Sequence, residues 1–295
     1  MVNIAVIGSG YWGSKIVESL KSINNINKIQ IIDIKNGQTI DSIDSDISAA
    51  IIATPLWDHH KTTIELLKRG LDCYVEKPLA ENSNQILEIK NYTKDNIVMV
   101  GHIFLYHPAL DIVKNNLCKV GTLKHIQSER LNWGIYQTKT TPLLSLLPHD
   151  VSIILDLCKS INVTSVKQNN FSNNVVPDYV SFDFVSENIS GSIVGSWYWP
   201  ERVRKLTVIG TEGQIIWDDV TNEVSIIKGS VHNRRLTETN KEILSPDMTV
   251  SPLERELTHF INCVIERKQP LTGIQNALDV ANVLDEVQER LNQDH

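Results

Sequence analysis

The chain has 295 residues and a formal net charge of −7, with 41% hydrophobic and 21% charged residues, which is typical of a globular protein with room for two cores. Its acidic balance, without a lysine-rich block, argues against nucleic acid as a partner. No apolar run reaches the roughly 18 residues of a membrane span, and the first strand leaves no room for a signal peptide, so we expect a cytoplasmic protein without a membrane partner.

The first predicted elements form a strand–helix–strand unit around a glycine turn. An apolar, β-branched run at 2–7 predicts a strand, and it leads into the G-x-G-x-x-G stretch of residues 8–13. A helical pattern follows, and a second strand ends at Asp33, at the spacing of about 20 residues after Gly13 that dinucleotide-binding proteins show. In this context the motif predicts a bound dinucleotide; the alternative is an ordinary unit of this kind with a glycine turn.

Each residue of this unit has an expected role. Gly8 allows the tight turn, Gly10 lets the backbone approach a pyrophosphate, and Gly13 lets the helix pack on the strand. The helix N-terminus supplies free N–H groups for the phosphates, and Tyr11 and Trp12 line the same turn. The Asp33 carboxylate would accept hydrogen bonds from the adenosine ribose and repel a 2′-phosphate, so NAD is favoured over NADP.

Further strand–helix pairs follow up to residue 102. Strands are predicted at 49–53, 73–75 and 97–100, and helices at 58–70 and from Ser83. Such repeats require a doubly wound parallel sheet with helices on both faces, whose ligands bind at the carboxyl ends of the strands. Three loops follow those ends: Thr54-Pro55, Glu76-Lys77-Pro78 and Gly101-His102.

The pattern changes near Gly121. A helix from Pro108 to about Cys118 is expected to close the first domain, predicted as residues 1–120. Residues 121–295 then predict an α+β domain with an open, mostly antiparallel sheet, from a run at 123–133, a helix at 148–157, and strands at 179–185, 189–199, 203–209, 214–217 and 224–227. Two C-terminal helices, at 253–267 and 273–291, could pack back on the first domain. The 4 cysteines show no C-x-x-C spacing and predict reduced thiols rather than a metal site.

Lys77 is the most informative candidate for catalysis. It lies between an acid and Pro78 at a strand end that faces the cofactor. A lysine there can bind a nicotinamide ribose or a substrate hydroxyl, and partial burial would lower its pKa towards a value suited to proton transfer. The alternative is a surface lysine before a loop proline. The isomer of the bond to Pro78 stays open.

His149 is the candidate general base, because its ordinary pKa near 6.5 suits proton abstraction from an alcohol. A structural histidine at an apolar helix start is the alternative. Ser145 shares the face of His149 only if the helix extends back through Pro148. Asp150 points about 100° away and is interpreted as a helix N-terminal acid stabilised by the dipole.

Other polar residues could complete the site. His102 and Tyr106 are candidates for the nicotinamide side, with core packing or capping as the alternative. His59 is expected to stabilise the first turn of its helix, and cofactor contact is the other possibility. Arg130 and Asn132, with later basic and aromatic residues, form either a wall for an anionic substrate or a hairpin surface and interface.

Taken together, these residues resemble the glucose–fructose oxidoreductase/inositol dehydrogenase (Gfo/Idh/MocA) family over nearly the whole chain. The most specific features are the glycine turn and Glu76-Lys77-Pro78, and further ones are Ala53-Thr54-Pro55 with His59, Val100-Gly101-His102 and His149. Gly10-Tyr11-Trp12-Gly13, Tyr106-His107-Pro108, Arg130-Leu131-Asn132 and Leu147-Pro148-His149-Asp150 resemble a subgroup of bacterial nucleotide-sugar dehydrogenases.

The resemblance implies NAD(P)-dependent hydride transfer at a sugar carbon, of a nucleotide-sugar used in surface-polysaccharide biosynthesis. It implies catalytic roles for Lys77 and His149, and homodimers or homotetramers built on the open sheet face. The chain departs from many members by having Ser145 where they have an aspartate. Two alternatives remain: a catalytically idle NAD-binding sensor or scaffold, and a family reductase acting on a non-sugar such as a tetrapyrrole or an imine.

Overall fold

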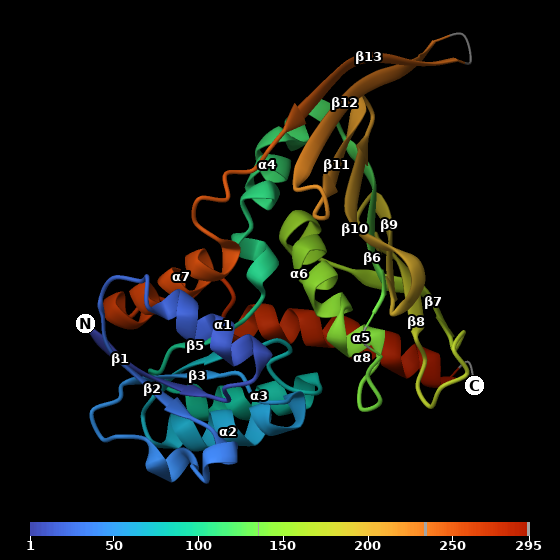
Figure 1. Cartoon of the computed structure of the whole chain (residues 1–295). Helices are drawn as coiled ribbons and strands as arrows, with labels where there is room; N and C mark the ends of the chain where they lie inside the picture. Colours follow the sequence, from blue (N-terminus) through green and yellow to red (C-terminus); the bar gives the residue numbers. More distant parts are fainter. Residues whose placement is uncertain (135, 233–234, 294–295) are drawn as a thin grey trace. The chain divides into compact units, whose positions relative to one another are not determined.

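The computed structural model describes residues 1–134, 136–232 and 235–293, and its helices and strands are labelled in Figure 1. The chain forms two compact units. The first contains Met1–Tyr106 and Val250–Asn282, and the second contains His107–Thr249 and Val283–His295. The predicted boundary at residue 120 is therefore too late. Helix α4 (Pro108–Asn116) packs on strands β11 and β12 of the second unit instead of closing the first.

The first unit is built on a five-stranded parallel sheet in the order β2-β1-β3-β4-β5. Its strands are β1 (Val2–Ile7), β2 (Ile26–Ile32), β3 (Ala49–Ile52), β4 (Asp72–Val75) and β5 (Val98–Val100). Its α-helices are α1 (Tyr11–Leu20), α2 (Leu56–Lys68), α3 (Ser83–Thr93), α7 (Pro252–Glu266) and the first part of α8 (Ile274–Gln293). Short 3₁₀ turns are η1 (Ile34–Asn36), η2 (Ile40–Ser42) and η3 (Ile103–Tyr106). The predicted doubly wound parallel sheet is confirmed.

Both faces of this sheet are covered, which is why its strands read as continuous apolar runs. In β1, Ala5 and Ile7 belong to the core formed with α2, α3 and the start of α8. The alternate residues Ile4 and Val6 belong to the core formed with α1 and α7, and Figure 1 shows these helices flanking the sheet. Helix α7, which comes from a segment far along the chain, thus helps α1 to cover one face of the first sheet.

Two helix starts differ by a few residues from the prediction. Helix α2 begins at Leu56 after Pro55, with Asp58 in its first turn. The cap of α3 is Asn82, whose side chain accepts a hydrogen bond from the amide of Gln85 at 3.0 Å. The predicted end of α2 is confirmed, because Gly70 has a φ of +79° directly after the helix.

The second unit contains an eight-stranded sheet in the order β13-β12-β11-β10-β6-β9-β8-β7. Its strands are β6 (Leu123–Trp133), β7 (Asn162–Asn169), β8 (Tyr179–Ser186), β9 (Ile189–Ser196), β10 (Tyr198–Gly210), β11 (Gly213–Asp218), β12 (Glu223–His232) and β13 (Arg235–Leu244). Its helices are α4, η4 (Leu117–Val120), α5 (Pro142–Ser145), α6 (Leu147–Cys158) and the rest of α8. Every pairing is antiparallel except β6 with β9.

One face of this sheet is covered and the other is open, as predicted. Helices α4, α5 and α6 contact the sheet, and the strand side chains beneath them, such as Phe182 and Phe184 of β8, are fully buried. The residues that alternate with these along each strand point to the other side of the sheet, which we call the open face. This face includes the exposed aliphatic residues Val185, Ile209 and Ile243. Within the described part of the chain, no helix combines the length and apolar character needed to cross a membrane.

Candidate cofactor and catalytic site

The turn between β1 and α1 has the geometry that its three glycines predict. Gly8 has a φ of +95°, and a Cβ there would lie 2.8 Å from the carbonyl oxygen of Ala53. A Cβ on Gly13 would lie 2.0 Å from the carbonyl oxygen of Gly8, so helix and strand touch at this point. At Gly10, by contrast, no atom of the described residues beyond its two chain neighbours lies within 4 Å of a Cβ position. The backbone is therefore open where a phosphate would approach.

A cavity of about 680 Å³ lies over this turn, within the size range of ligand pockets. Seven predicted cofactor residues line it: Gly8, Gly10, Tyr11, Trp12, Asp33, Thr54 and Pro55. The remaining wall comes mainly from the segment 35–40, which includes Gln38 and Ile40, and from α2, which includes Lys61. No described side chain caps the N-terminus of α1, so its amides are available to a dinucleotide pyrophosphate. These residues fit the predicted cofactor.

Asp33 is held in place before any ligand binds. Its Oδ2 accepts hydrogen bonds from the amide of Ser9, at 2.9 Å, and from the Ser9 hydroxyl, and its Oδ1 accepts one from the amide of Lys35 at 2.8 Å. These hydrogen bonds lower the pKa of Asp33 to about 2. The bond from the Ser9 hydroxyl has the largest effect, followed by the bonds from the two amides. The carboxylate is therefore ionised at neutral pH, and its remaining lone pairs can accept from ribose hydroxyls.

His59 does not line the cavity and lies buried behind it. Its Nδ1 lies 2.8 Å from the carbonyl oxygen of Pro78, and its Nε2 lies 2.8 Å from that of Thr54. The ring thus joins the loop after β3 to the loop that carries Lys77, a role that helix position alone did not indicate. Burial is the main cause that lowers the pKa of His59, which favours a neutral ring that donates to one of the two carbonyls.

Glu76 is half-buried and connects two loops, and it is not part of the cavity wall. Its Oε1 accepts a hydrogen bond from the indole Nε1 of Trp12, and its Oε2 accepts one from the amide of Lys77 at 3.3 Å. Burial raises the pKa of Glu76 to about 7. The side chain therefore ties the glycine turn to the Lys77 loop, in which the bond from Lys77 to Pro78 is cis.

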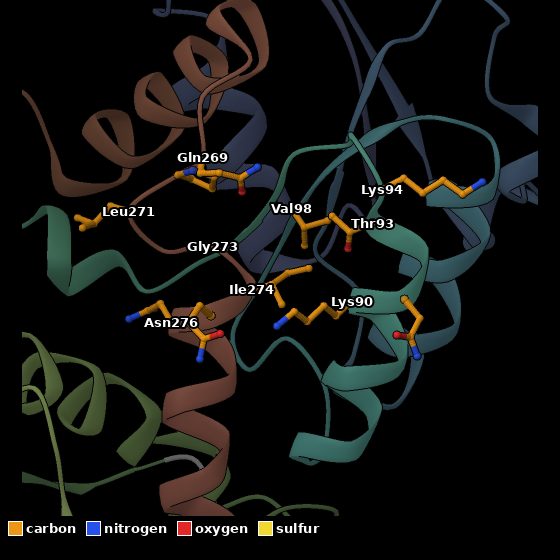
Figure 2. A pocket seen from close by; sticks show the side chains of 12 residues that line it. Lys90, Thr93, Lys94, Val98, Gln269, Leu271, Gly273, Ile274 and Asn276 are labelled. Atoms are coloured by element: carbon orange, nitrogen blue, oxygen red, sulfur yellow. The ribbon is translucent and has the colours of Figure 1, made fainter.

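His102 and Tyr106 are fixed by residues near the start of α8. The Nδ1 of His102 donates to the Oδ1 of Asn276 at 2.7 Å, and burial lowers the pKa of His102 to about 4, so its ring is neutral. The Tyr106 hydroxyl lies 3.1 Å from the hydroxyl of Thr272. Asn276 also lines a second cavity of about 610 Å³ beside the end of α3, which shares no lining residue with the first (Figure 2).

The second unit carries the other predicted residues. His149 lies in the first turn of α6 and Ser145 ends α5, so the two belong to separate helices divided at Leu146. Asn132 is half-buried near the end of β6. Helix α6 extends back through Pro148 only as far as Leu147, so the condition for a face shared by Ser145 and His149 is not met.

Arg130 and Asp150 form a buried ion pair that sequence reasoning did not connect. Arg130 Nε lies 2.7 Å from Asp150 Oδ2, and its Nη2 lies 3.2 Å from Oδ1. The hydroxyl of Ser128 also donates to Oδ1 at 2.6 Å. Asp150 thus anchors the first turn of α6, next to His149, to strand β6. Only the alternation of β6, which places Ser128 and Arg130 on one face, pointed towards this contact.

Comparison with known proteins gives a family for the first unit. Residues 2–103 match the Gfo/Idh/MocA model, described as an oxidoreductase family with an NAD-binding Rossmann fold. A 2,7-anhydro-N-acetylneuraminate hydratase of Mediterraneibacter gnavus is 26% identical over 150 residues, which cover 45% of this chain and only 40% of that protein. The enzyme of the same name from Escherichia coli is 24% identical over 280 residues, which cover 82% of this chain and 74% of the relative.

A solved structure extends the likeness in fold to both units. The UDP-N-acetylglucosamine 3-dehydrogenase of Acidithiobacillus ferrooxidans superposes with a TM-score of 0.81 over 98% of each chain, at 16% identity. At that identity the likeness concerns the fold. The match at residues 2–103 spans the glycine turn, Asp33 and the Lys77 loop, and the predicted NAD cofactor agrees with it. Residues 2–103 therefore match the NAD-binding Rossmann part of the Gfo/Idh/MocA oxidoreductase family.

Proposed function

We propose that this protein is an NAD(P)-dependent oxidoreductase that acts on a sugar carbon, with a nucleotide-sugar as the substrate class. The observation that supports the proposal most is the pair of hydrogen bonds that Glu76 accepts from the Trp12 indole and the Lys77 amide. It ties the glycine turn, where the dinucleotide cavity lies, to the loop of Lys77. The names of the relatives support a sugar substrate, because they refer to an anhydro-sialic acid and a UDP-sugar.

In this proposal, bound NAD supplies the acceptor for a hydride from the carbon that bears the reacting hydroxyl. Lys77 orients that hydroxyl through its ammonium group and stabilises the negative charge that develops on the oxygen. His149 takes the hydroxyl proton as a general base. The buried pair of Asp150 and Arg130 keeps the first turn of α6 in place on β6, so His149 keeps its position.

A second candidate follows from the names of the two curated relatives, which are called hydratases. Addition of water changes the product without net oxidation, so no NADH accumulates. Product analysis therefore has to accompany the measurement of NADH. A sugar product with one added water and no net NADH would favour this second candidate.

The test combines a substrate panel with the variant Lys77→Ala. Purified protein with NAD and a panel of UDP-sugars and other nucleotide-sugars is followed at 340 nm, and NAD affinity is measured by calorimetry. We expect at least one substrate to produce NADH. For that substrate, Lys77→Ala should lower turnover at least about a hundredfold while NAD still binds, because a positioned proton-transfer group contributes about 10²–10⁴-fold.

The matched control is Lys21→Ala, which removes an exposed lysine paired with Glu18 and should leave turnover unchanged. Full turnover in Lys77→Ala would remove Lys77 from the proposal. The absence of any NADH or hydrated product across the panel, in protein that binds NAD, would instead support a sensor or scaffold.

A further inference from the structure

A buried chain of hydrogen-bonding groups leads from α7 to the Lys77 loop. Glu256, in α7, is fully buried. The phenol oxygen of Tyr74 lies 3.0 Å from Oε2 of Glu256 and 3.3 Å from Oε1 of Glu76. Glu76 in turn accepts from the Trp12 indole and the Lys77 amide. Two carboxyl groups from distant segments of the chain therefore meet at one phenol.

The number of protons available at Tyr74, Glu76 and Glu256 limits how many of the two carboxyl groups can be ionised. The Tyr74 phenol has a single proton, so it donates to one carboxyl group at a time. A second hydrogen bond at the phenol requires the other carboxyl group to be protonated and to donate. Two ionised carboxylates would also repel each other in a buried place, where the charged form is disfavoured.

The surroundings indicate which carboxyl group carries the proton. Glu76 receives hydrogen bonds from Trp12 and Lys77, which favour its ionised form. Within the described part of the chain, Oε1 of Glu256 is buried and has no hydrogen-bond partner. Burial, followed by the charge of Glu76, raises the pKa of Glu256 well above its ordinary value. Glu256 is thus the neutral acid of the pair.

We propose that Glu256 is a positioning residue for Lys77. As an uncharged acid it donates to Tyr74, Tyr74 donates to Glu76, and the Glu76 carboxylate stays fixed between the Trp12 indole and the Lys77 amide. The assignment of Lys77 rests on the proposed function, whereas the hydrogen-bonded chain does not. Helix α7 thereby sets the distance between the glycine turn, which carries Trp12, and the loop of Lys77.

The groups around the cluster are consistent with this arrangement. The titratable groups that act on it are Lys77 from its own loop, Tyr74 from β4, Glu256 from α7 and Tyr106 from η3. His259 packs its ring on Tyr106 at 5.4 Å. The backbone of Gly101 also comes close to the phenol, because a Cβ there would lie 2.6 Å from the Tyr74 hydroxyl oxygen. Only a glycine therefore fits beside the phenol at this position.

The test uses the fluorescence of Trp12, whose indole donates to Glu76. Fluorescence is titrated from pH 5 to 9 in the free, full-length protein, and the signal of the same protein carrying Trp12→Phe is subtracted. The Glu76 transition should appear near neutral pH, because the pKa of Glu76 is raised to about 7. Circular dichroism over the same range confirms that each variant stays folded.

Three variants distinguish the possible arrangements. Tyr74→Phe removes a donor to the Glu76 carboxylate, so the midpoint should rise by about one pH unit. Glu256→Leu should also raise the midpoint of the Glu76 transition, because the Tyr74 hydroxyl loses its hydrogen bond to α7. Glu256→Gln keeps an uncharged donor of the same shape and should restore the wild-type midpoint. Glu266→Gln, at the end of the same helix and paired with Lys268, is the matched control.

Two results would overturn the proposal. If Glu256 were ionised, Glu256→Gln would remove a negative charge beside Glu76 and lower the midpoint. If Glu256→Leu matched the wild type while Tyr74→Phe shifted, Glu256 would have no positioning role. Where a substrate is found, Glu256→Leu should lower kcat at least about tenfold while NAD affinity is kept. A failure of the whole sugar panel would remove the proposed function, and the fluorescence titration would still decide this inference.

Discussion

At the residue scale, Asp33 is expected to decide between NAD and NADP. Its carboxylate is ionised and oriented by Ser9 and Lys35. The change Asp33→Asn removes the charge and should weaken NAD binding about tenfold, since a hydrogen bond to a charged group contributes about 1.5–3 kcal/mol. Repulsion of a 2′-phosphate should fall at the same time. Calorimetric Kd values for NAD and NADP measure both effects, and an unchanged ratio would contradict the role.

The lowered pKa of Asp33 also predicts how the stability of the folded protein changes at acid pH. The pKa of Asp33 is about 2 in the folded protein, below the value of about 3.9 expected in the unfolded chain. Its stabilising contribution is therefore complete above about pH 4 and is lost as the pH falls towards 2. Thermal unfolding of Asp33→Asn should accordingly depend less on pH in this window than that of the wild type.

Local and distant residues differ in how far the sequence reveals them. Gly8, Gly10 and Asp33 were predictable because one strand–turn–helix unit fixes all their positions. Glu256 and Asn276 were not, because their partners Tyr74 and His102 lie 182 and 174 residues away in the sequence. Those contacts depend on α7 and α8 packing against the first unit, which hydrophobic periodicity does not specify.

At the element scale, the attachment of α6 to β6 depends on the pair of Arg130 and Asp150. Both side chains are buried, with 6% and 2% of their areas exposed. The change Asp150→Ala leaves a buried guanidinium without its carboxylate and should lower the free energy of unfolding by about 3–5 kcal/mol. Urea denaturation measures this loss.

The double variant Arg130→Met with Asp150→Leu is the control for that experiment. It removes both charges and replaces them with apolar groups, so it should lose much less stability than the single variant. An equal loss in both proteins would mean that side-chain volume, and not the unpaired charge, determines the effect.

Elements also differ in how well the sequence predicts them. Strand β7 has a single buried residue, Val163, and β13 is a mostly polar strand. Both are edge strands of the second sheet, so neither shows the apolar alternation by which a strand is recognised. Short α5 was missed because four residues are too few for a helical period.

At the scale of the whole molecule, the open face of the second sheet favours association of identical chains. Val185, Ile209 and Ile243 remain 41%, 37% and 53% exposed on one side of a sheet whose other side is covered by helices. Exposed aliphatic side chains on a sheet face that no helix covers are typical of an interface. Homodimers or homotetramers through this face therefore remain our prediction.

The mass of the particle in solution tests this prediction. Light scattering after size-exclusion chromatography should give a dimer or tetramer of the 33.3 kDa chain. Ile209→Lys places a charge on the open face and should dissociate the particle, because burying an unpaired ammonium costs several kcal/mol. The matched control is Ile265→Lys, an exposed isoleucine of α7 in the first unit, which should leave the mass unchanged. A monomeric wild type, or dissociation only in the Ile265 variant, would place the interface elsewhere or remove it.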